Sequence, residues 1–167
     1  LRTHGLLTPK IIAHDVSQGF LLITDFGDSL LLNELNTANV EIFYTQALAA
    51  LGILQSCSEV PAWPVPPFTA DFMYKELKLF QEWYLQNYLA LTLSATTESM
   101  LDQLFIFLAQ TAASQPQVFM HRDYHSANLM VLPHNQIGIL DFQDAFIGPV
   151  TYDLVSLLRD CYIAWPN

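Results

Sequence analysis

Basic residues are scarce in this sequence, and it contains no long apolar run. Six Lys and Arg stand against sixteen Asp and Glu, which gives a net charge of −10. This balance disfavours a nucleic-acid partner, because binding to a phosphate backbone depends on many Lys and Arg contacts. No apolar run approaches the roughly 18 residues that a membrane span requires, and the N-terminal residues lack the basic start of a signal peptide. We therefore expect a cytoplasmic protein that binds neither nucleic acid nor a membrane.

Cysteine is also rare, with Cys57 and Cys161 far apart in the sequence. Such usage favours reduced thiols over a disulfide framework. In contrast, 52% of the 167 residues are apolar, enough to bury one sizeable core. The sequence therefore predicts a globular unit that does not depend on disulfides.

Polar groups suited to phosphoryl transfer are concentrated in the stretch His-Arg-Asp-Tyr-His-Ser-Ala-Asn at positions 121–128 and in Asp141-Phe142-Gln143. Phosphoryl transfer needs a carboxylate that takes the proton of the attacking hydroxyl, and oxygen ligands that hold Mg²⁺ against the nucleotide phosphates. Asp123 is the candidate base. Asn128 and Asp141 are the candidate ligands, since Mg²⁺ prefers oxygen atoms. The pattern predicts an enzyme that uses ATP and Mg²⁺.

The spacing of these residues predicts a β-hairpin. Asn128 opens the apolar run 129–132, the run 137–140 leads into Asp141, and residues 133–136 between them favour a reversal. Such a hairpin brings Asn128 and Asp141 together so that one ion can contact both. Asp123 then lies on the preceding loop, facing a substrate hydroxyl.

Other segments predict two strands followed by helices. Residues 9–15 and 19–28 indicate two strands around a turn, the second of which runs into a glycine-containing linker, and a proline-rich loop covers 61–67. Apolar spacing predicts helices from Val40 to before Cys57, from near Thr69, from near Thr97 to before Ser114, and after Gly148-Pro149.

The motifs resemble those of the aminoglycoside phosphotransferase and choline kinase superfamily, whose members are related to protein kinases and phosphorylate small molecules. The resemblance rests on a His-x-Asp-x-His-x-x-Asn loop, here His121, Asp123, His125 and Asn128, and on the Asp141-Phe142 pair. It implies that the two histidines belong to the catalytic loop, where His125 would orient the loop through its ring nitrogens. It also implies that Asp153, after Gly148-Pro149, anchors this loop by hydrogen bonds.

Three longer segments, 76–84, 140–145 and 148–162, resemble the bacterial anomeric kinases of cell-wall amino sugars. This resemblance implies ATP-dependent phosphorylation of the anomeric hydroxyl of N-acetylmuramate or N-acetylglucosamine. Within the segments, Glu76, Glu82 and Trp83 are candidates for holding the sugar, although helical spacing favours a core position for Trp83. Asp144 either approaches the metal or acceptor, or caps the turn before Gly148.

The resemblance also implies an α+β, protein-kinase-like fold, mostly the helical large lobe with a catalytic β-hairpin. Residues 1–27 would be the last strands and hinge of the small lobe, and 28–167 the large lobe, truncated at its C-terminus. Thr24, Asp25 and Phe26 would form the hinge that presents backbone groups to adenine; a strand-to-helix linker is the alternative. A glycine-rich loop and a strand Lys paired to a helix Glu are missing, so we expect this chain alone to be a poor kinase.

Two other functions remain open. An aminoglycoside or choline-type phosphotransferase would share the catalytic residues and would need a carboxylate cluster for its cationic acceptor, which Asp144, Glu76 and Glu82 could provide if they converge. A non-catalytic binding module would explain the missing lysine and glycine-rich loop. A protein kinase is disfavoured, because the segment from Asp141 to Gly148 is too short for an activation loop and leaves Arg122 without an obvious phosphate to contact.

Overall fold

The computed structural model describes residues 1–57 and 64–165. Helices are α1 (Leu31–Glu34), α2 (Val40–Gln55), α3 (Ala70–Leu79), α4 (Ala95–Ala113) and α5 (Tyr152–Leu158), with a π-helical segment η2 (Phe80–Tyr88). Strands are β1 (Ile11–Asp15), β2 (Phe20–Ile23), β3 (Gln117–Met120), β4 (Leu129–Leu132), β5 (Gln136–Ile139) and β6 (Phe146–Pro149). Short 3₁₀ turns are η1 (Arg2–His4), η3 (Ser126–Asn128) and η4 (Pro133–Asn135). Part of the predicted proline-rich loop lies outside the described residues.

The predicted hairpin is confirmed as β4 and β5, which pair antiparallel with Leu129 opposite Ile139. Its turn is η4, in which His134 and Asn135 have φ values of 64° and 59°. Asn and His are among the non-glycine residues that adopt this left-handed conformation most readily. The second strand begins at Gln136, one residue earlier than predicted.

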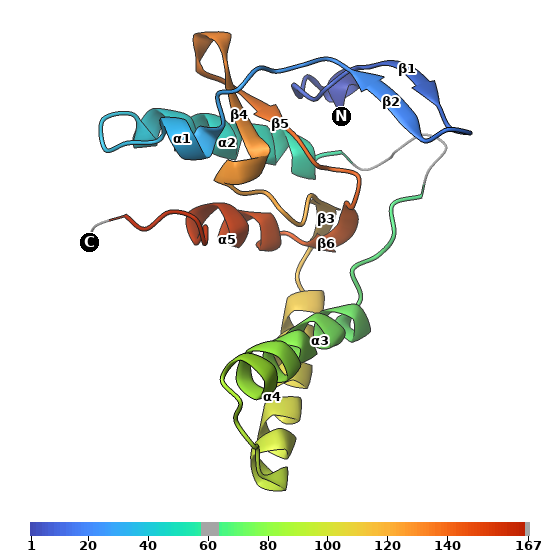
Figure 1. The fold of residues 1–167 in the computed structure, drawn as a ribbon, viewed down its shortest axis with the longest axis vertical. Coiled ribbons are helices and arrows are strands. Elements are labelled where there is room, and N and C mark those ends of the chain that lie inside the picture. The colour runs from blue at the N-terminus through green and yellow to red at the C-terminus, as the bar shows by residue number, and fades with distance from the viewer. Residues whose placement is uncertain (58–63, 166–167) are drawn as a thin grey trace.

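Backbone hydrogen bonds extend this hairpin on both edges. The Ile139 N–H donates to the Leu7 carbonyl at 2.8 Å, and the Val131 N–H donates to the Ser29 carbonyl at 2.8 Å. The N-terminal segment and the linker before α1 therefore flank the hairpin, with β1 and β2 between them in sequence (Figure 1). The predicted β1–β2 pair is confirmed by its antiparallel register.

A second antiparallel pair, β3 with β6, was not predicted. Gln117 lies opposite Pro149 and Met120 opposite Phe146. Because β3 leads into the stretch at 121–128 and β6 follows Asp141, this pair fixes both ends of the chain segment that contains the candidate site.

The predicted helices are present, with one error at a helix start. The Thr69 hydroxyl caps α3 by accepting the Phe72 N–H at 3.2 Å, as expected for a residue of this type. In α4, however, the cap is Ser94, whose hydroxyl accepts the Thr97 N–H at 3.1 Å, so the helix begins before the predicted position near Thr97.

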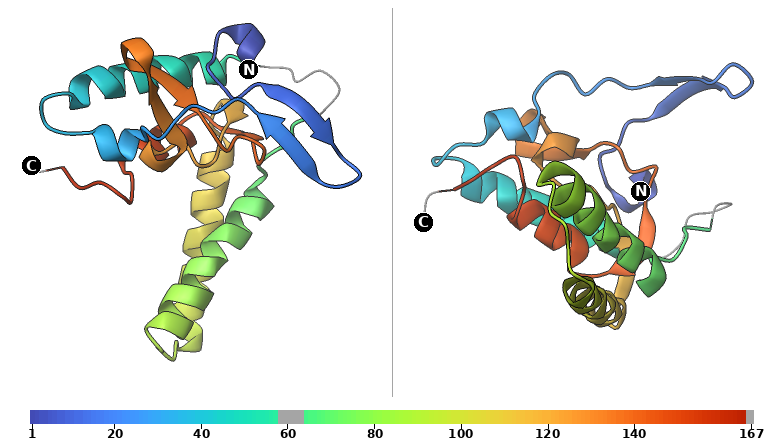
Figure 2. Two further views of the ribbon diagram at one scale, coloured as in Figure 1. Left: turned by 45° about the horizontal axis from the view of Figure 1, so that its top comes forward. Right: turned by 60° about the horizontal axis from the view of Figure 1, so that its bottom comes forward.

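The elements form a body and a projecting arm (Figure 1). The body contains β4–β5, β3–β6 and helices α1, α2 and α5, and its core includes Phe43, Leu54, Tyr124, Ile139 and Leu157. The arm, consisting of α3, η2 and α4, extends away from the body, as the left view of Figure 2 shows. A small apolar cluster of Phe68, Met73, Ala109 and Met120 joins arm to body.

Within residues 1–57 and 64–165, no helix is long and apolar enough to cross a membrane. Cys57 is buried and Cys161 is exposed, and neither forms a disulfide.

Candidate active site

Asp153 at the start of α5 holds the loop that contains Asp123. Its Oδ2 accepts the His121 N–H at 2.7 Å and its Oδ1 accepts the Arg122 N–H at 3.0 Å. The carboxylate is 1% exposed, and burial raises the pKa of Asp153 to about 6, although the two backbone hydrogen bonds act in the opposite direction. These contacts are the ones expected of an anchor for the loop.

His121 lies beneath the same loop and has no exposed surface. Its Nδ1 accepts the Asp123 N–H at 3.3 Å, and its Nε2 lies 2.7 Å from the Leu140 carbonyl oxygen. Since a carbonyl only accepts, the proton must be on Nε2. Burial lowers the pKa of His121, which favours this neutral ring. His121 therefore positions Asp123 and the residue before Asp141, and it does not face a substrate.

Asp123 is exposed while its backbone is fixed on both sides. Besides the N–H bond to His121, its carbonyl accepts the Asn128 Nδ2–H at 3.1 Å. This bond fixes the orientation of the Asn128 amide, so its oxygen remains as a ligand atom. The loop therefore presents one free carboxylate and one oriented amide oxygen.

Asp141 lies at the same end of the hairpin as Asn128. The Leu140 N–H donates to the Asn128 carbonyl at 3.0 Å, which continues the β4–β5 ladder to this point. Asp141 is exposed, with φ of 59°, and its Oδ1 accepts the Gln143 Nε2–H at 2.5 Å. One amide and one carboxylate oxygen suit Mg²⁺, which completes its shell with water and phosphate oxygens. In the part of the chain that the structure describes, no three His, Cys, Asp or Glu side chains cluster as in an all-protein metal site.

A second carboxylate, Asp160, holds the other half of the loop and was missed by the sequence reasoning. Its Oδ2 accepts the Ser126 N–H at 2.8 Å and the Ser126 hydroxyl at 2.5 Å, and its Oδ1 accepts the Tyr162 N–H at 2.8 Å. Ser126 is 1% exposed and Asp160 is 8% exposed. The available signal was a carboxylate two residues after an apolar helix, but such a residue also suits a solvated helix end.

His125 does not orient the loop in the predicted way. Its Nδ1 is enclosed and makes no hydrogen bond within residues 1–57 and 64–165. The ring instead packs edge-on against Tyr162, with centroids 5.2 Å apart. His125 contributes packing beside the second anchor, rather than the hydrogen bonds that were expected.

The predicted hinge lines a pocket of about 310 Å³ with Met130 and Leu140. The Thr24 hydroxyl accepts the Lys10 N–H at 2.8 Å, and the Asp25 carboxylate accepts the Gly27 N–H at 2.8 Å. Both side chains thus support local backbone. Phe26 packs on the hairpin at Gly138, where an added Cβ would lie 2.8 Å from its ring. The pocket therefore lies between the hinge segment and the hairpin that carries the two candidate metal ligands.

The whole chain, residues 1–167, matches the phosphotransferase enzyme family. The chain belongs to this family. Its curated relatives include the N-acetylmuramate/N-acetylglucosamine kinase of Pseudomonas aeruginosa, 38% identical over 98% of this chain and 47% of the relative. The kinase of the same name from Neisseria meningitidis is 34% identical over 94% of this chain and 47% of the relative. The chain thus spans about half the length of the curated relatives it matches.

Solved phosphotransferase structures share the fold. ADP-bound aminoglycoside phosphotransferase APH(2'')-Ib superposes with a TM-score of 0.65 at 14% identity, covering 94% of this chain and 55% of that one. Choline kinase LicA from Streptococcus pneumoniae gives 0.62 at 18% identity, covering 98% and 54%. The predicted α+β, protein-kinase-like fold is confirmed.

Of the four predicted acceptor residues, Glu76 directly contacts the loop at 121–128. Glu76 Oε1 lies 2.6 Å from Arg122 Nη2, so Arg122 has a partner that the sequence did not reveal. Glu82 and Trp83 lie on η2 in the arm, and Trp83 is 66% exposed, so its predicted core position is wrong. Asp144 is exposed on the loop before β6.

Proposed function

We propose that the complete gene product carrying this chain is an ATP- and Mg²⁺-dependent kinase that phosphorylates the anomeric hydroxyl of N-acetylmuramate or N-acetylglucosamine. The observation that carries the proposal is the exposed Asp123 carboxylate on a backbone fixed at both its N–H and its carbonyl, beside Asn128 and Asp141. The curated kinases at 38% and 34% identity support this choice of acceptor.

In this proposal Asp123 orients the acceptor hydroxyl and takes its proton, the role that a catalytic-loop Asp has in related phosphoryl transfers. Asn128 and Asp141 would hold Mg²⁺ through the amide and carboxylate oxygens. The bound ion would neutralise charge on the nucleotide phosphates. Thr24, Asp25 and Phe26 would hold adenine through backbone groups in the pocket beside the hairpin. We also propose that residues 1–27 are a remnant of the small lobe and that residues 28–167 form the large lobe.

A cationic acceptor such as an aminoglycoside or choline is less well supported. Such an acceptor would need several free carboxylates near Asp123, and Asp144, Glu76 and Glu82 were the candidates. Glu76 is engaged with Arg122, and Glu82 belongs to the arm segment η2. Two of the three carboxylates that this alternative requires are therefore not free beside Asp123.

The test is ATP consumption by the complete gene product with Mg²⁺ and N-acetylmuramate, N-acetylglucosamine or kanamycin, with the product's phosphate located by NMR. Sugar-dependent turnover that yields an anomeric phosphate is expected. Turnover on kanamycin alone would reassign the protein to the cationic-acceptor branch. Nucleotide binding without turnover on any of the three would favour a non-catalytic binding module.

A further inference from the structure

Arg122, the residue directly before the candidate base, is joined to the arm by an ion pair. Its Nη2 lies 2.6 Å from Oε1 of Glu76 in α3, and the two side chains are 25% and 30% exposed. The residues are 46 positions apart in sequence. This contact therefore links the arm to the loop that presents Asp123.

The rest of Arg122 is also held in place. Its guanidinium carbon lies 5.9 Å, 5.7 Å and 5.2 Å from the ring centroids of Phe68, Phe72 and Phe146. These distances are within the range of cation–π attraction. Arg122 Nε is buried and has no hydrogen-bond partner in the described residues, so the contact with Glu76 is the polar contact that fixes the direction of the side chain.

The backbone of Arg122 is strained, with φ of 79°. A non-glycine residue keeps this conformation only when surrounding contacts hold it. Asp153 holds the Arg122 N–H, but the side chain is held from the arm. Since Asp123 is the next residue, relaxation at Arg122 would displace its carboxylate.

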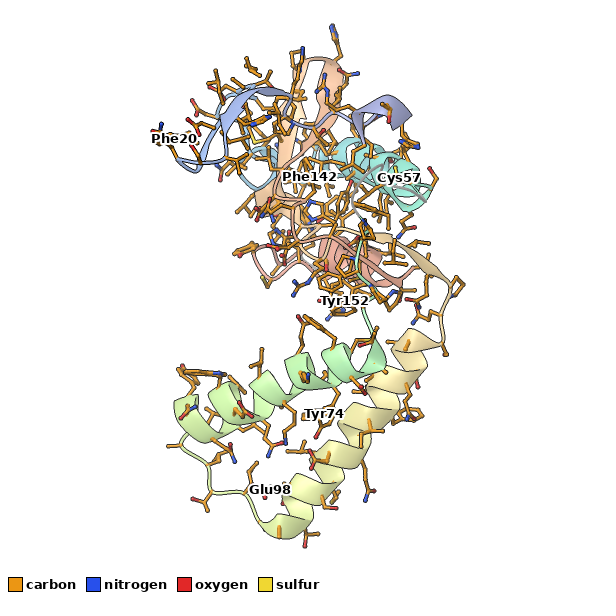
Figure 3. The ribbon with its side chains drawn as sticks, turned by 90° about the vertical axis from the view of Figure 1, so that its right-hand side faces the viewer. Phe20, Cys57, Tyr74, Glu98, Phe142 and Tyr152 are labelled. Atoms are coloured by element: carbon orange, nitrogen blue, oxygen red, sulfur yellow. The ribbon has the colours of Figure 1, made fainter. Side chains whose placement is uncertain are left out.

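The junction between arm and body also contains an aromatic cluster, in which the rings of Phe68 and Phe72 pack on Phe146 with centroids 5.4 Å and 5.2 Å apart. A pocket of about 440 Å³ there is lined by Glu76 and by apolar residues of α3 and α4, with Tyr152 on the body side. Figure 3 shows Tyr152 at this junction. Apolar and aromatic contacts therefore join the arm to the body, and the pair between Arg122 and Glu76 joins the arm to the loop that presents Asp123.

We propose that Glu76 is a positioning residue whose carboxylate holds Arg122, and through it Asp123, so that the arm is coupled to the candidate base without any covalent modification. The catalytic consequence rests on the proposed function. Glu76 gives Arg122 the acidic partner that a phosphorylated loop would otherwise offer to an arginine at this position. Glu76 then acts through Arg122 and does not bind the acceptor.

The effect should appear in turnover more than in stability. Partly exposed ion pairs contribute little to folding, whereas a misplacement of about 1 Å at a catalytic group can cost on the order of a hundredfold in rate. In the complete gene product, Glu76→Gln should lower kcat roughly tenfold or more, with KM for ATP and for the acceptor nearly unchanged. Combining Glu76→Gln with Arg122→Gln should be no worse than Arg122→Gln alone.

The arm offers a matched control in the pair between Lys78 and Asp102, with Nζ and Oδ1 2.9 Å apart. Asp102→Asn removes a comparable carboxylate that holds α3 to α4 and does not touch the loop. It should leave kcat near the wild-type value. Equal kcat values in Glu76→Gln and Asp102→Asn would overturn the proposal, and a loss confined to acceptor KM would assign Glu76 to acceptor binding instead.

A second readout does not require turnover. Hydrogen exchange at the backbone amides of residues 121–125 should accelerate in Glu76→Gln relative to both wild type and Asp102→Asn, because the loop loses its tie to the arm. Unchanged exchange would contradict the coupling. If no tested acceptor is phosphorylated, the proposed function fails while this measurement still decides whether Glu76 holds the loop.

Discussion

Removing the Asp160 carboxylate should lower the free energy of unfolding more than removing the Ser126 hydroxyl, whose hydrogen bond this carboxylate accepts. Asp160 receives three hydrogen bonds, two from Ser126 and one from the Tyr162 N–H. Ser126→Ala deletes one donor and leaves the other two bonds in place. Asp160→Ala leaves the buried N–H and hydroxyl of Ser126 with no acceptor, while Tyr162 is 57% exposed and its N–H can turn to water.

The expected changes in the free energy of unfolding follow from the number of hydrogen bonds that each variant loses. Losing one hydrogen bond to a charged group costs about 1.5–3 kcal/mol, so Ser126→Ala should lower the free energy of unfolding by about that amount. Each buried donor left unpaired costs about 1–3 kcal/mol, so Asp160→Ala should cost about 3–5 kcal/mol. The double variant should be no less stable than Asp160→Ala. It lacks the Ser126 hydroxyl, so it no longer buries that donor without an acceptor.

The assay is urea unfolding followed by circular dichroism, at pH 7, for the wild type, both single variants and the double variant. Turnover measured in parallel should fall in Asp160→Ala, since the loop between Asp123 and Asn128 loses its second anchor. Asp160 does not hold the loop in this way if Asp160→Ala lowers the free energy of unfolding no more than Ser126→Ala does, or if the two changes add independently in the double variant.

Two further predictions concern the first anchor and the hinge. Burial raises the pKa of Asp153 to about 6 from 3.8, so the folded state binds this proton more tightly, and the contribution of Asp153 to stability should fall as the pH rises from about 4 to above 6. Burial lowers the pKa of His121, so the contribution of His121 changes with the opposite sign, and the comparison is therefore between wild type and Asp153→Asn. About two pKa units correspond to about 3 kcal/mol, so in urea titrations the stability of Asp153→Asn relative to wild type should rise by about that amount across this pH range, and a difference that does not change with pH would contradict the prediction. Gly138→Ala should push Phe26 from the hairpin, cost about 1–3 kcal/mol and weaken binding of Mg²⁺-ADP measured by calorimetry. Gly52→Ala, in α2 with open space around its Cβ, is the control and should stabilise by about 0.5–1 kcal/mol; equal effects of the two changes would exclude the contact with Phe26 as the cause.

The hairpin could be predicted because its signals are local. Two apolar runs flank a segment with residues that tolerate a reversal, and the pairing of Leu129 with Ile139 follows from the turn length. Once the hairpin is placed, the proximity of Asn128 and Asp141 follows from chain connectivity. The anchor role of Asp153 came from a family resemblance, since nothing in its sequence neighbourhood identifies the N–H groups that it accepts.

Non-local contacts could not be predicted in this way. The β3–β6 pair joins four-residue strands, one of which ends in Gly-Pro and therefore also suits a turn. The contact between Arg122 and Glu76 depends on how the arm packs against the body, and no local pattern encodes that geometry. The contact between Asp160 and Ser126 could not be predicted either, because a carboxylate after a helix is usually solvated.

Trp83 shows how a helical pattern can mislead. Spacing of three and four from Met73 predicts one continuous buried side, but the chain becomes π-helical at Phe80 and the arm is packed mainly between α3 and α4. Phe80, Tyr84 and Tyr88 do share a side, stacked on one another at centroid distances of 5.4 Å and 5.8 Å, yet all three are exposed. Periodicity identified the face correctly, while burial depended on what the rest of the fold places against it.

We propose above all that Asp123 is the base of a phosphotransferase site and that Asn128 and Asp141 are its metal ligands. The most direct test is kcat of the Asp123→Asn variant of the complete gene product with saturating Mg²⁺-ATP and N-acetylmuramate, beside an Asp71→Asn control at an exposed carboxylate of α3. We expect kcat to fall roughly a hundredfold to ten-thousandfold in Asp123→Asn alone, with Mg²⁺-ATP binding retained. Turnover within a few-fold of the control would contradict it.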